Sequence, residues 1–234
     1  MTYPVPAYDD AGGPSGYTYA GLVVQGAAEI EAARTDAALR RIRFSGWIAP
    51  PDNGWIVVVA GQGDATIAAG RRGVLEVGGW LSAELQTTVF AFRVLADRQL
   101  AIAAWAGGTE VGRYLSDPSY ASAGDSLDDE PVGVEYASAF AEAAGRPTAS
   151  AELADLLGDR LDPDSVVESE RLADSLRLLG FPQWLVSVSS LPRDIPAGPS
   201  ARSLTRLGAG VGGLAGRPVA GAVGILRRWR PPRA

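Results

Sequence analysis

TTVFAFRVLADRQLAIAAWAGGTEVGRYL, residues 87–115, is the stretch that decides the fold. It contains three strand-like apolar runs, at 87–95, 99–106 and 109–115. Ala96-Asp97-Arg98 and Gly107-Gly108 connect them. Connections this short join antiparallel neighbours, because a parallel crossover needs a dozen or more residues. The stretch therefore predicts an antiparallel meander.

A β-hairpin is expected upstream of the meander, after a short apolar run at 20–24. Residues 41–48 alternate between apolar and polar side chains, which is the period of a half-buried strand. The turn-forming sequence at 50–54, PPDNG, then leads into the apolar run at 55–60. The pattern predicts two paired strands.

Two helices are expected in the same half of the chain. Residues 27–40 are rich in Ala, Glu and Arg, and we place Ile30 and Leu39 on one face of this helix. Residues 74–85 space their apolar side chains at helical intervals. The adjacent glycines Gly78 and Gly79 weaken that second helix by about 1 kcal/mol each relative to alanine.

Beyond Pro118 the chain is expected to be mainly helical. One helix is predicted from Pro131 to a stop at Gly145, and a second over 150–157. A longer one opens at Asp162-Pro163 and ends at Gly180. Its apolar stripe consists of Leu172, Leu176 and Leu179. Two oppositely charged pairs on it are expected to be exposed, Glu168 with Arg171 and Asp174 with Arg177. A last strand is expected at 187–191.

These elements predict an α+β fold, an antiparallel sheet of five or six strands with helices packed on one face. We expect an N-terminal extension over residues 1–19, an α+β domain over 20–194 and a basic, glycine-rich tail over 195–234. With 47% hydrophobic residues and six tryptophans, the chain has enough apolar side chains for a real core.

The chain contains no Lys, His or Cys, and all 21 basic residues are Arg. This composition excludes an imidazole base, a Schiff-base amine, a thiolate nucleophile, the P-loop lysine and the usual His and Cys zinc sites. Carboxylates and hydroxyls remain, without a distinctive arrangement. We therefore expect no cofactor and a protein that acts by binding instead of catalysis.

Charge is distributed unevenly along the chain. Residues 1–194 hold all 27 acidic residues and 14 arginines, a net charge of −13, whereas residues 195–234 hold seven arginines and no acid. An acidic body disfavours nucleic acid as a partner. Residues 1–21 lack the basic and long apolar regions of a signal peptide, which favours a cytoplasmic protein.

The basic tail has two interpretations. Residues 207–226 hold 11 apolar residues and seven glycines, interrupted by Arg217. The tail either folds back on the acidic body or remains a solubilising extension; alternatively, it docks on a protein partner or an anionic membrane surface. Gly208, Gly210 and Gly213 match G-x-G-x-x-G only formally, because neither a βαβ unit nor a later acid accompanies them. The candidate contacts are Arg217, Arg227, Arg228, Trp229, Arg230 and Arg233.

An acidic loop is the candidate metal or hydrolytic site. Asp125, Asp128, Asp129 and Glu130 supply the oxygen ligands that hard cations prefer, although their spacing does not fit an EF-hand. Helix capping and a solvated loop explain the same residues. A carboxylate- or metal-dependent hydrolase is thus the alternative function.

Tryptophans are expected to divide between core and surface. Four of them lie inside predicted strands or helices and are expected to be buried or half-buried: Trp47, Trp55, Trp80 and Trp105. Trp184, beside Phe181 and Pro182, is the candidate for a surface contact with a partner.

The order of segments over residues 80–190 resembles a group of uncharacterised bacterial α+β proteins. In that group a glycine turn, a tyrosine and a Ser-x-Pro precede an acidic loop, helices and a Leu-Gly-x-Pro-x-Trp segment. The resemblance implies a fold and no activity. The matching positions are Gly107, Gly108, Tyr114, Ser116, Pro118, Leu179, Gly180, Pro182 and Trp184.

We therefore expect a non-catalytic interaction protein, an inhibitor or assembly component, whose acidic body binds a protein partner and whose basic tail docks elsewhere. Acidic charge raises the encounter rate with such a partner more than its affinity. A peripheral membrane protein anchored by the arginine-rich tail is the third hypothesis.

Overall fold

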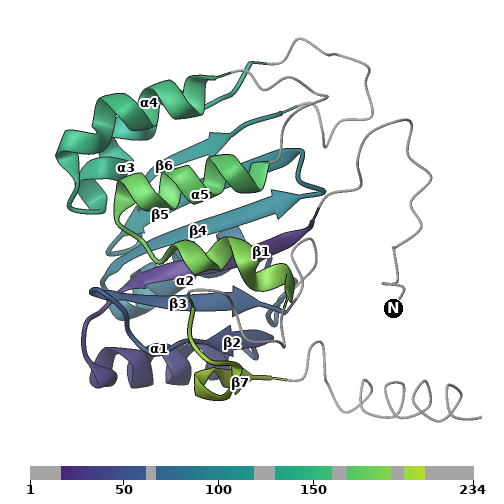
Figure 1. Ribbon diagram of the computed structural model, residues 1–234. Helices are drawn as coiled ribbons and strands as arrows, with labels where there is room; N and C mark the ends of the chain where they lie inside the picture. The colour runs from purple at the N-terminus through teal and green to yellow at the C-terminus, as the bar shows by residue number, and fades with distance from the viewer. Residues whose placement is uncertain (1–16, 62–66, 119–129, 160–167, 191–197, 209–234) are drawn as a thin grey trace, which may run out of the picture.

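A seven-stranded antiparallel sheet forms the centre of the molecule, in the order β6-β5-β4-β1-β3-β2-β7 (Figure 1). The computed structural model describes residues 17–61, 67–118, 130–159, 168–190 and 198–208. The strands are β1 (Tyr19–Gln25), β2 (Gly46–Ile48), β3 (Trp55–Ala60), β4 (Thr88–Leu95), β5 (Gln99–Ala106), β6 (Thr109–Leu115) and β7 (Thr205–Leu207).

The helices confirm the α+β class but lie on both faces of the sheet, so the expectation of a single helical face is wrong. Strand β1 shows why: Leu22 and Val24 pack into the cluster that includes α1 and α2, whereas Val23 packs into the cluster of α3, α4 and α5. Buried residues on both sides of a strand require two covered faces. The helices are α1 (Glu29–Arg41), α2 (Val74–Leu85), α3 (Ala137–Ala143), α4 (Ser150–Gly158) and α5 (Glu168–Leu179), with short 3-10 helices η2 (Val134–Tyr136), η3 (Pro147–Ala149), η4 (Gln183–Ser190) and η5 (Ala201–Ser203).

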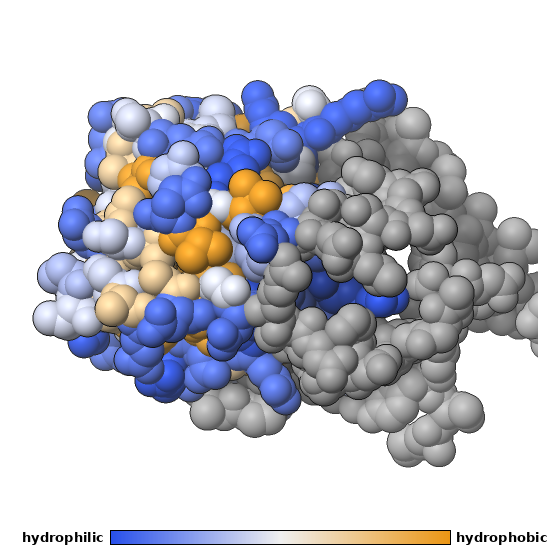
Figure 2. All heavy atoms as spheres, turned by 90° about the horizontal axis from the view of Figure 1, so that it is seen from above, coloured by the Kyte–Doolittle hydropathy of each residue, from blue (hydrophilic) through white to orange (hydrophobic). Residues whose placement is uncertain are grey.

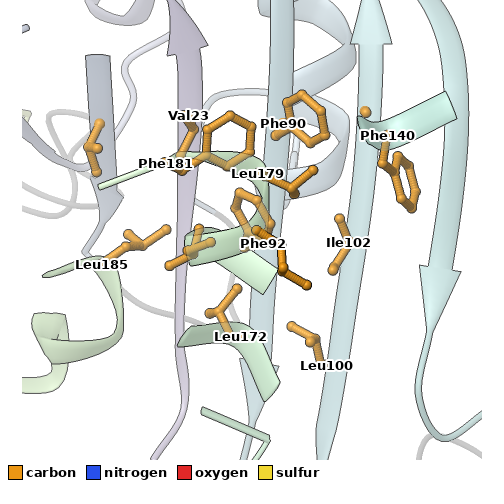
Figure 3. Packing of buried hydrophobic residues seen from close by; sticks show 14 of the residues in the cluster. Val23, Phe90, Phe92, Leu100, Ile102, Phe140, Leu172, Leu179, Phe181 and Leu185 are labelled. Atoms are coloured by element: carbon orange, nitrogen blue, oxygen red, sulfur yellow. The ribbon is translucent and has the colours of Figure 1, made fainter. Parts of the chain in front are cut away.

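The core on the α5 face is built around phenylalanines. The ring of Phe181 lies 4.8 Å from that of Phe90 and 4.6 Å from that of Trp55, both in edge-to-face geometry. Figure 3 shows Phe181 and Leu179 over the Phe90 and Phe92 side chains of β4. Edge-to-face rings gain electrostatic attraction in addition to the burial of their apolar area.

The core on the opposite face depends on close packing of α2 against β5. A Cβ atom added to Gly78 would lie 2.6 Å from the Trp105 ring and 3.2 Å from Ala91 Cβ. A Cβ atom on Gly79 would lie 3.1 Å from the same ring. The two glycines that weaken the helix locally therefore let α2 approach the sheet.

The meander is confirmed, and its turns have the expected chemistry. Gly107 and Gly108 have φ angles of 56° and 86°, and Ala96 and Asp97 have φ angles of 49° and 58°. Positive φ at a short hairpin turn matches the right-handed twist of the strands that it connects.

The elements predicted upstream of the meander are present, but two details differ, the faces of α1 and the start of β2. The hairpin of β2 and β3 and the helix α2 are confirmed, as is the helix α1. Within α1, however, Leu39 is buried and Ile30 is 66% exposed. Nine residues turn a helix through two and a half turns, so the two side chains lie on opposite faces. Strand β2 begins only at Gly46, after Arg43 with a φ of 55°.

Three further corrections lie in the second half of the chain. The helix expected from Pro131 begins later, because Val132 forms a β-bridge with Leu115. The expected strand over 187–191 is wrong, since residues 183–190 form η4. The strand β7 lies beyond residue 194 and pairs with β2. Of the pairs expected to be exposed, Asp174 with Arg177 is confirmed, whereas the other is buried.

Candidate functional site

Strand β6 forms one edge of the sheet, where it pairs with β5. Its two ladder registers are separated by an irregularity opposite Ala104 and Trp105, which leaves Val111 as an extra residue. Bulges at a sheet edge bend the strand and disfavour the addition of another strand. The bulge thus protects this edge of the sheet against uncontrolled pairing with a strand of another molecule.

The chain returns along β6 after the acidic loop and covers part of this edge. The N–H of Leu115 donates to the carbonyl of Val132 and the N–H of Val132 donates to that of Leu115, both at 2.9 Å. Gly133, with a φ of 90°, follows, and its Cα lies so close to the Arg113 carbonyl that a Cβ would collide with it. The returning segment thus pairs with the end of β6 at Leu115 and lies against it at Arg113.

Apolar side chains gather where these two segments lie together. Val132 is 56% exposed and Tyr136 is 39% exposed, and Tyr136 packs over Gly112, where an added Cβ would lie 2.6 Å from Tyr136 Cβ. Figure 2, which looks down on this side of the molecule, shows a group of hydrophobic residues ringed by hydrophilic ones. We define the edge patch as the half-buried and exposed hydrophobic residues of β6 and of the returning segment, which are Val111, Leu115, Val132, Val134 and Tyr136.

The surroundings of the edge patch are strongly acidic. Residues 109–118 and 130–159 carry two arginines, Arg113 and Arg146, and a net charge of −6. The parts of the chain that build the opposite half, residues 29–61, 67–86 and 198–208, carry eight arginines and six acids, a net charge of +2. A cationic molecule is therefore attracted toward the β6 side. The eight acids are Glu110, Asp117, Glu130, Glu135, Glu142, Glu152, Asp155 and Asp159.

A buried polar cluster supports the edge patch from behind. The hydroxyl of Tyr114 donates to the Leu157 carbonyl at 3.0 Å and accepts a short hydrogen bond from Arg171. Arg171 also donates to the Asp159 carbonyl at 2.5 Å. Burial raises the pKa of Tyr114 to about 12, so its hydroxyl keeps the proton that it donates. The cluster fastens β6 to α4 and α5.

Beside it, the start of α5 is fixed to the turn between β4 and β5. The backbone and the hydroxyl of Ser169 both donate to the Asp97 carboxylate, and the Tyr19 hydroxyl donates to the Ser169 hydroxyl at 2.8 Å. Desolvation raises the pKa of Tyr19. These hydrogen bonds pair the polar side chains with one another, so the cluster has a structural role and holds the start of α5 in place.

A shallow hollow of about 180 Å³ lies between the N-terminal half of α1 and the end of α2. Glu31, Arg34, Thr35 and Gln86 are among the residues that line it. Most of its polar groups already have partners: Glu31 accepts from the Ala28 N–H at 2.8 Å, and Thr35 and Gln86 donate to backbone carbonyls. Its volume is below that of typical ligand pockets, about 300–1,000 Å³.

The structure describes two of the candidate site residues, Trp184 and Glu130. Trp184 is only 6% exposed and belongs to the core on the α5 face, so the expected surface contact is wrong. The other four tryptophans are buried or half-buried, as predicted. Glu130 is exposed at the start of the returning segment. The remaining candidates lie outside the described residues: Asp125, Asp128, Asp129, Arg217, Arg227, Arg228, Trp229, Arg230 and Arg233.

Two further features concern the described residues alone. Within them, His, Cys, Asp and Glu form no group of three or more that could hold a metal ion. In the same part of the chain, no helix combines the length and the apolar character needed to cross a bilayer. No family model, no curated protein and no solved structure matches the chain.

The edge patch is not among the features that the sequence predicted. Val132 and Tyr136 follow an acidic loop and are four residues apart, a spacing that is equally typical of the helix predicted from Pro131 to Gly145. The exposed fraction of these side chains depends on Gly133, which turns the chain along β6.

Proposed function

We propose that the protein is a non-catalytic interaction module and that the edge patch binds a protein partner. The observation that carries the proposal is the gathering of exposed apolar side chains, Val132 at 56% and Tyr136 at 39%, inside an acidic surface. An apolar group ringed by polar residues is typical of protein-binding surfaces.

The chemistry of the surface defines the partner. Its rim has a net charge of −6, and the ion pairs described for two of its acids, Glu110 with Arg113 at 3.1 Å and Glu152 with Arg177 at 3.4 Å, are exposed to solvent. A matching partner presents apolar side chains flanked by Arg or Lys. The rim charges accelerate the encounter, and the apolar centre supplies the lifetime of the complex.

The rigidity of the surface also supports this proposal. Tyr114 and Arg171 fasten the strand beneath the patch to α4 and α5. A surface that is held in one conformation pays less conformational entropy on binding. The edge patch is therefore suited to rigid docking on a partner.

A pair of matched variants tests the proposal. Val132→Asp places a charge in the edge patch, whereas Ile30→Asp places the same charge at an exposed apolar residue on α1, which is 66% exposed against 56% for Val132. Affinity isolation from the source cell with each full-length variant, followed by mass spectrometry, should yield proteins retained by wild type and Ile30→Asp and lost with Val132→Asp.

The isolated partner then provides the decisive measurement. Introducing a charge into the centre of an interface costs on the order of 2 kcal/mol or more, about a thirtyfold rise in Kd. Titration calorimetry should show this rise with Val132→Asp and an unchanged Kd with Ile30→Asp. Equal binding by the two variants would exclude the edge patch as the docking surface.

A further inference from the structure

We infer that the chain's own C-terminal segment, residues 219–230, occupies the edge patch of the same molecule and competes there with the partner. The inference rests on the proposed function, since it assigns a regulator to the same surface. It is drawn from three properties of the segment: its charge, its apolar content and its reach.

Charge is the first argument. Residues 209–234 carry five arginines and no acid, and four of these arginines lie between 227 and 233. The half of the molecule around β6 carries −6, whereas the half around α1, α2 and β7 carries +2. The arginine group is therefore attracted to the β6 side and weakly repelled by the side from which the tail departs.

The second argument is apolar complementarity. Residues 219–226, VAGAVGIL, form an apolar run that directly precedes Arg227, Arg228, Trp229 and Arg230. The edge patch is complementary to this segment, because its apolar side chains also lie beside charged residues, which here are acids. The run would cover the exposed side chains of Val132 and Tyr136 while the arginines meet the acidic rim.

The third argument is reach. The tail leaves from Gly208, next to β7, and β7 and β6 are the two edges of the seven-stranded sheet. Six interstrand spacings separate them, about 29 Å. The 18 residues from 209 to 226 span up to about 60 Å when extended, which is sufficient to go around the sheet. Because the tail is tethered, its binding needs no second molecule.

The absence of cysteine from the chain makes a direct test simple. Spin labels are attached to the full-length double variant Ser138→Cys with Ala234→Cys, in which Ser138 is an exposed residue on α3 beside the patch. The matched control is Ala37→Cys with Ala234→Cys, whose first label is on α1. Pulsed electron resonance then measures the distance between the two labels.

The first pair should give a short distance, well below the ~29 Å width of the sheet, and the control pair a long one. Substituting three arginines together, Arg227→Ser, Arg228→Ser and Arg230→Ser, should remove the short distance. The double variant Glu135→Gln with Asp155→Asn should do the same from the patch side. Equal distances for both label pairs, or a short distance that survives these substitutions, would overturn the inference.

Dilution identifies the molecule to which the tail belongs. The short distance should persist when labelled protein is mixed with an excess of unlabelled protein, because both labels are on one chain. Its loss would show docking on a second copy and would overturn the inference in its intramolecular form.

Failure of this inference and failure of the proposed function have different signatures. If the tail does not dock but Val132→Asp still loses a partner, only the inference fails. If the short distance is present while both aspartate variants behave alike in partner binding, the proposed function fails. When both hold, the triple arginine variant binds the partner with a lower apparent Kd, in proportion to the fraction of patches that the tail had occupied.

Discussion

Glu168 and Arg171, three residues apart on α5, are buried together, with 3.5 Å between Glu168 Oε2 and Arg171 Nε. Tyr114 lies against the arginine, and Asp97 and Asp117 add negative charge near the glutamate. Desolvation raises the pKa of Glu168, while Arg171 and a hydrogen bond from Ser116 oppose the rise. A buried pair of this kind stabilises little by its net energy, but it makes the loss of either partner costly.

The raised pKa of Glu168 predicts a dependence of stability on pH. The folded chain holds this proton more tightly than the unfolded chain, in which the pKa is near 4.5. As the pH rises from about 4.5 through the pKa of the folded state, Glu168 therefore lowers the free energy of unfolding. Glu168→Gln removes the titration, so the stability of wild type relative to this variant should fall over that window. Urea unfolding at a series of pH values measures the difference.

The control for this titration is Glu170→Gln, since Glu170 belongs to the first turn of the same helix and is exposed. The stability of wild type relative to Glu170→Gln should not fall with rising pH in the way expected for Glu168→Gln. A parallel pH dependence of the two variants would contradict the buried, proton-retaining state of Glu168.

Tyr114→Phe should destabilise the fold by about 1–3 kcal/mol, the cost of leaving buried hydrogen-bonding groups unsatisfied. The variant removes the hydroxyl that donates to the Leu157 carbonyl and accepts from Arg171. Tyr136→Phe is the matched control, because Tyr136 is exposed and its hydroxyl makes no hydrogen bond described for this part of the chain. Chemical unfolding should separate the two variants, and an equal loss would argue against the Tyr114 clamp.

Gly78→Ala should destabilise the protein although alanine favours helix by about 1 kcal/mol over glycine. The new Cβ would lie 2.6 Å from the Trp105 ring, and overpacking of this kind costs about 1–3 kcal/mol. Gly79→Ala should lose less, because its closest approach to the ring is 3.1 Å. Thermal unfolding with near-ultraviolet dichroism of the tryptophans tests the order, and a gain in stability from Gly78→Ala would refute the close-packing argument.

Local signals predicted most of the elements, and tertiary arrangement explains the failures. The meander and α2 follow from short connections, turn residues and periodicity, all of which are local. The two-sided covering of the sheet does not, although the continuous apolar run of β3, WIVVVA, indicated a strand buried on both faces. Glu168 and Arg171 have the spacing of an exposed pair, and only the packing of α5 against β5 and α4 buries them.

The assignment of faces within α1 gives a fourth prediction. Leu39→Ala should cost about 2–5 kcal/mol, the range for a large-to-small change in a core. Ile30→Ala should stay within about 0.5 kcal/mol, because Ile30 is 66% exposed. Urea midpoints of the two variants measure the contrast, which also establishes that Ile30 is a neutral position for the aspartate control. Similar losses of unfolding free energy in the two variants would instead support burial of both side chains on one face of α1.

The division between rim and centre of the edge patch predicts separate kinetic effects on partner binding. Glu135→Gln with Asp155→Asn removes two exposed acids near the patch and should mainly slow association, more so at low salt, because rim charges steer the encounter. Val132→Asp should mainly speed dissociation, because the apolar centre holds the complex together.

The charge-matched control for the rim variant is Glu29→Gln with Glu76→Gln, two exposed acids on α1 and α2. It changes the net charge of the protein by the same amount at the other side of the molecule, so a smaller change in association rate is expected. Surface plasmon resonance at several salt concentrations gives both rate constants. If the two double variants slow association equally, total charge and not the rim of the edge patch directs the partner, and the acidic surroundings of Val132 and Tyr136 have no local role in recognition.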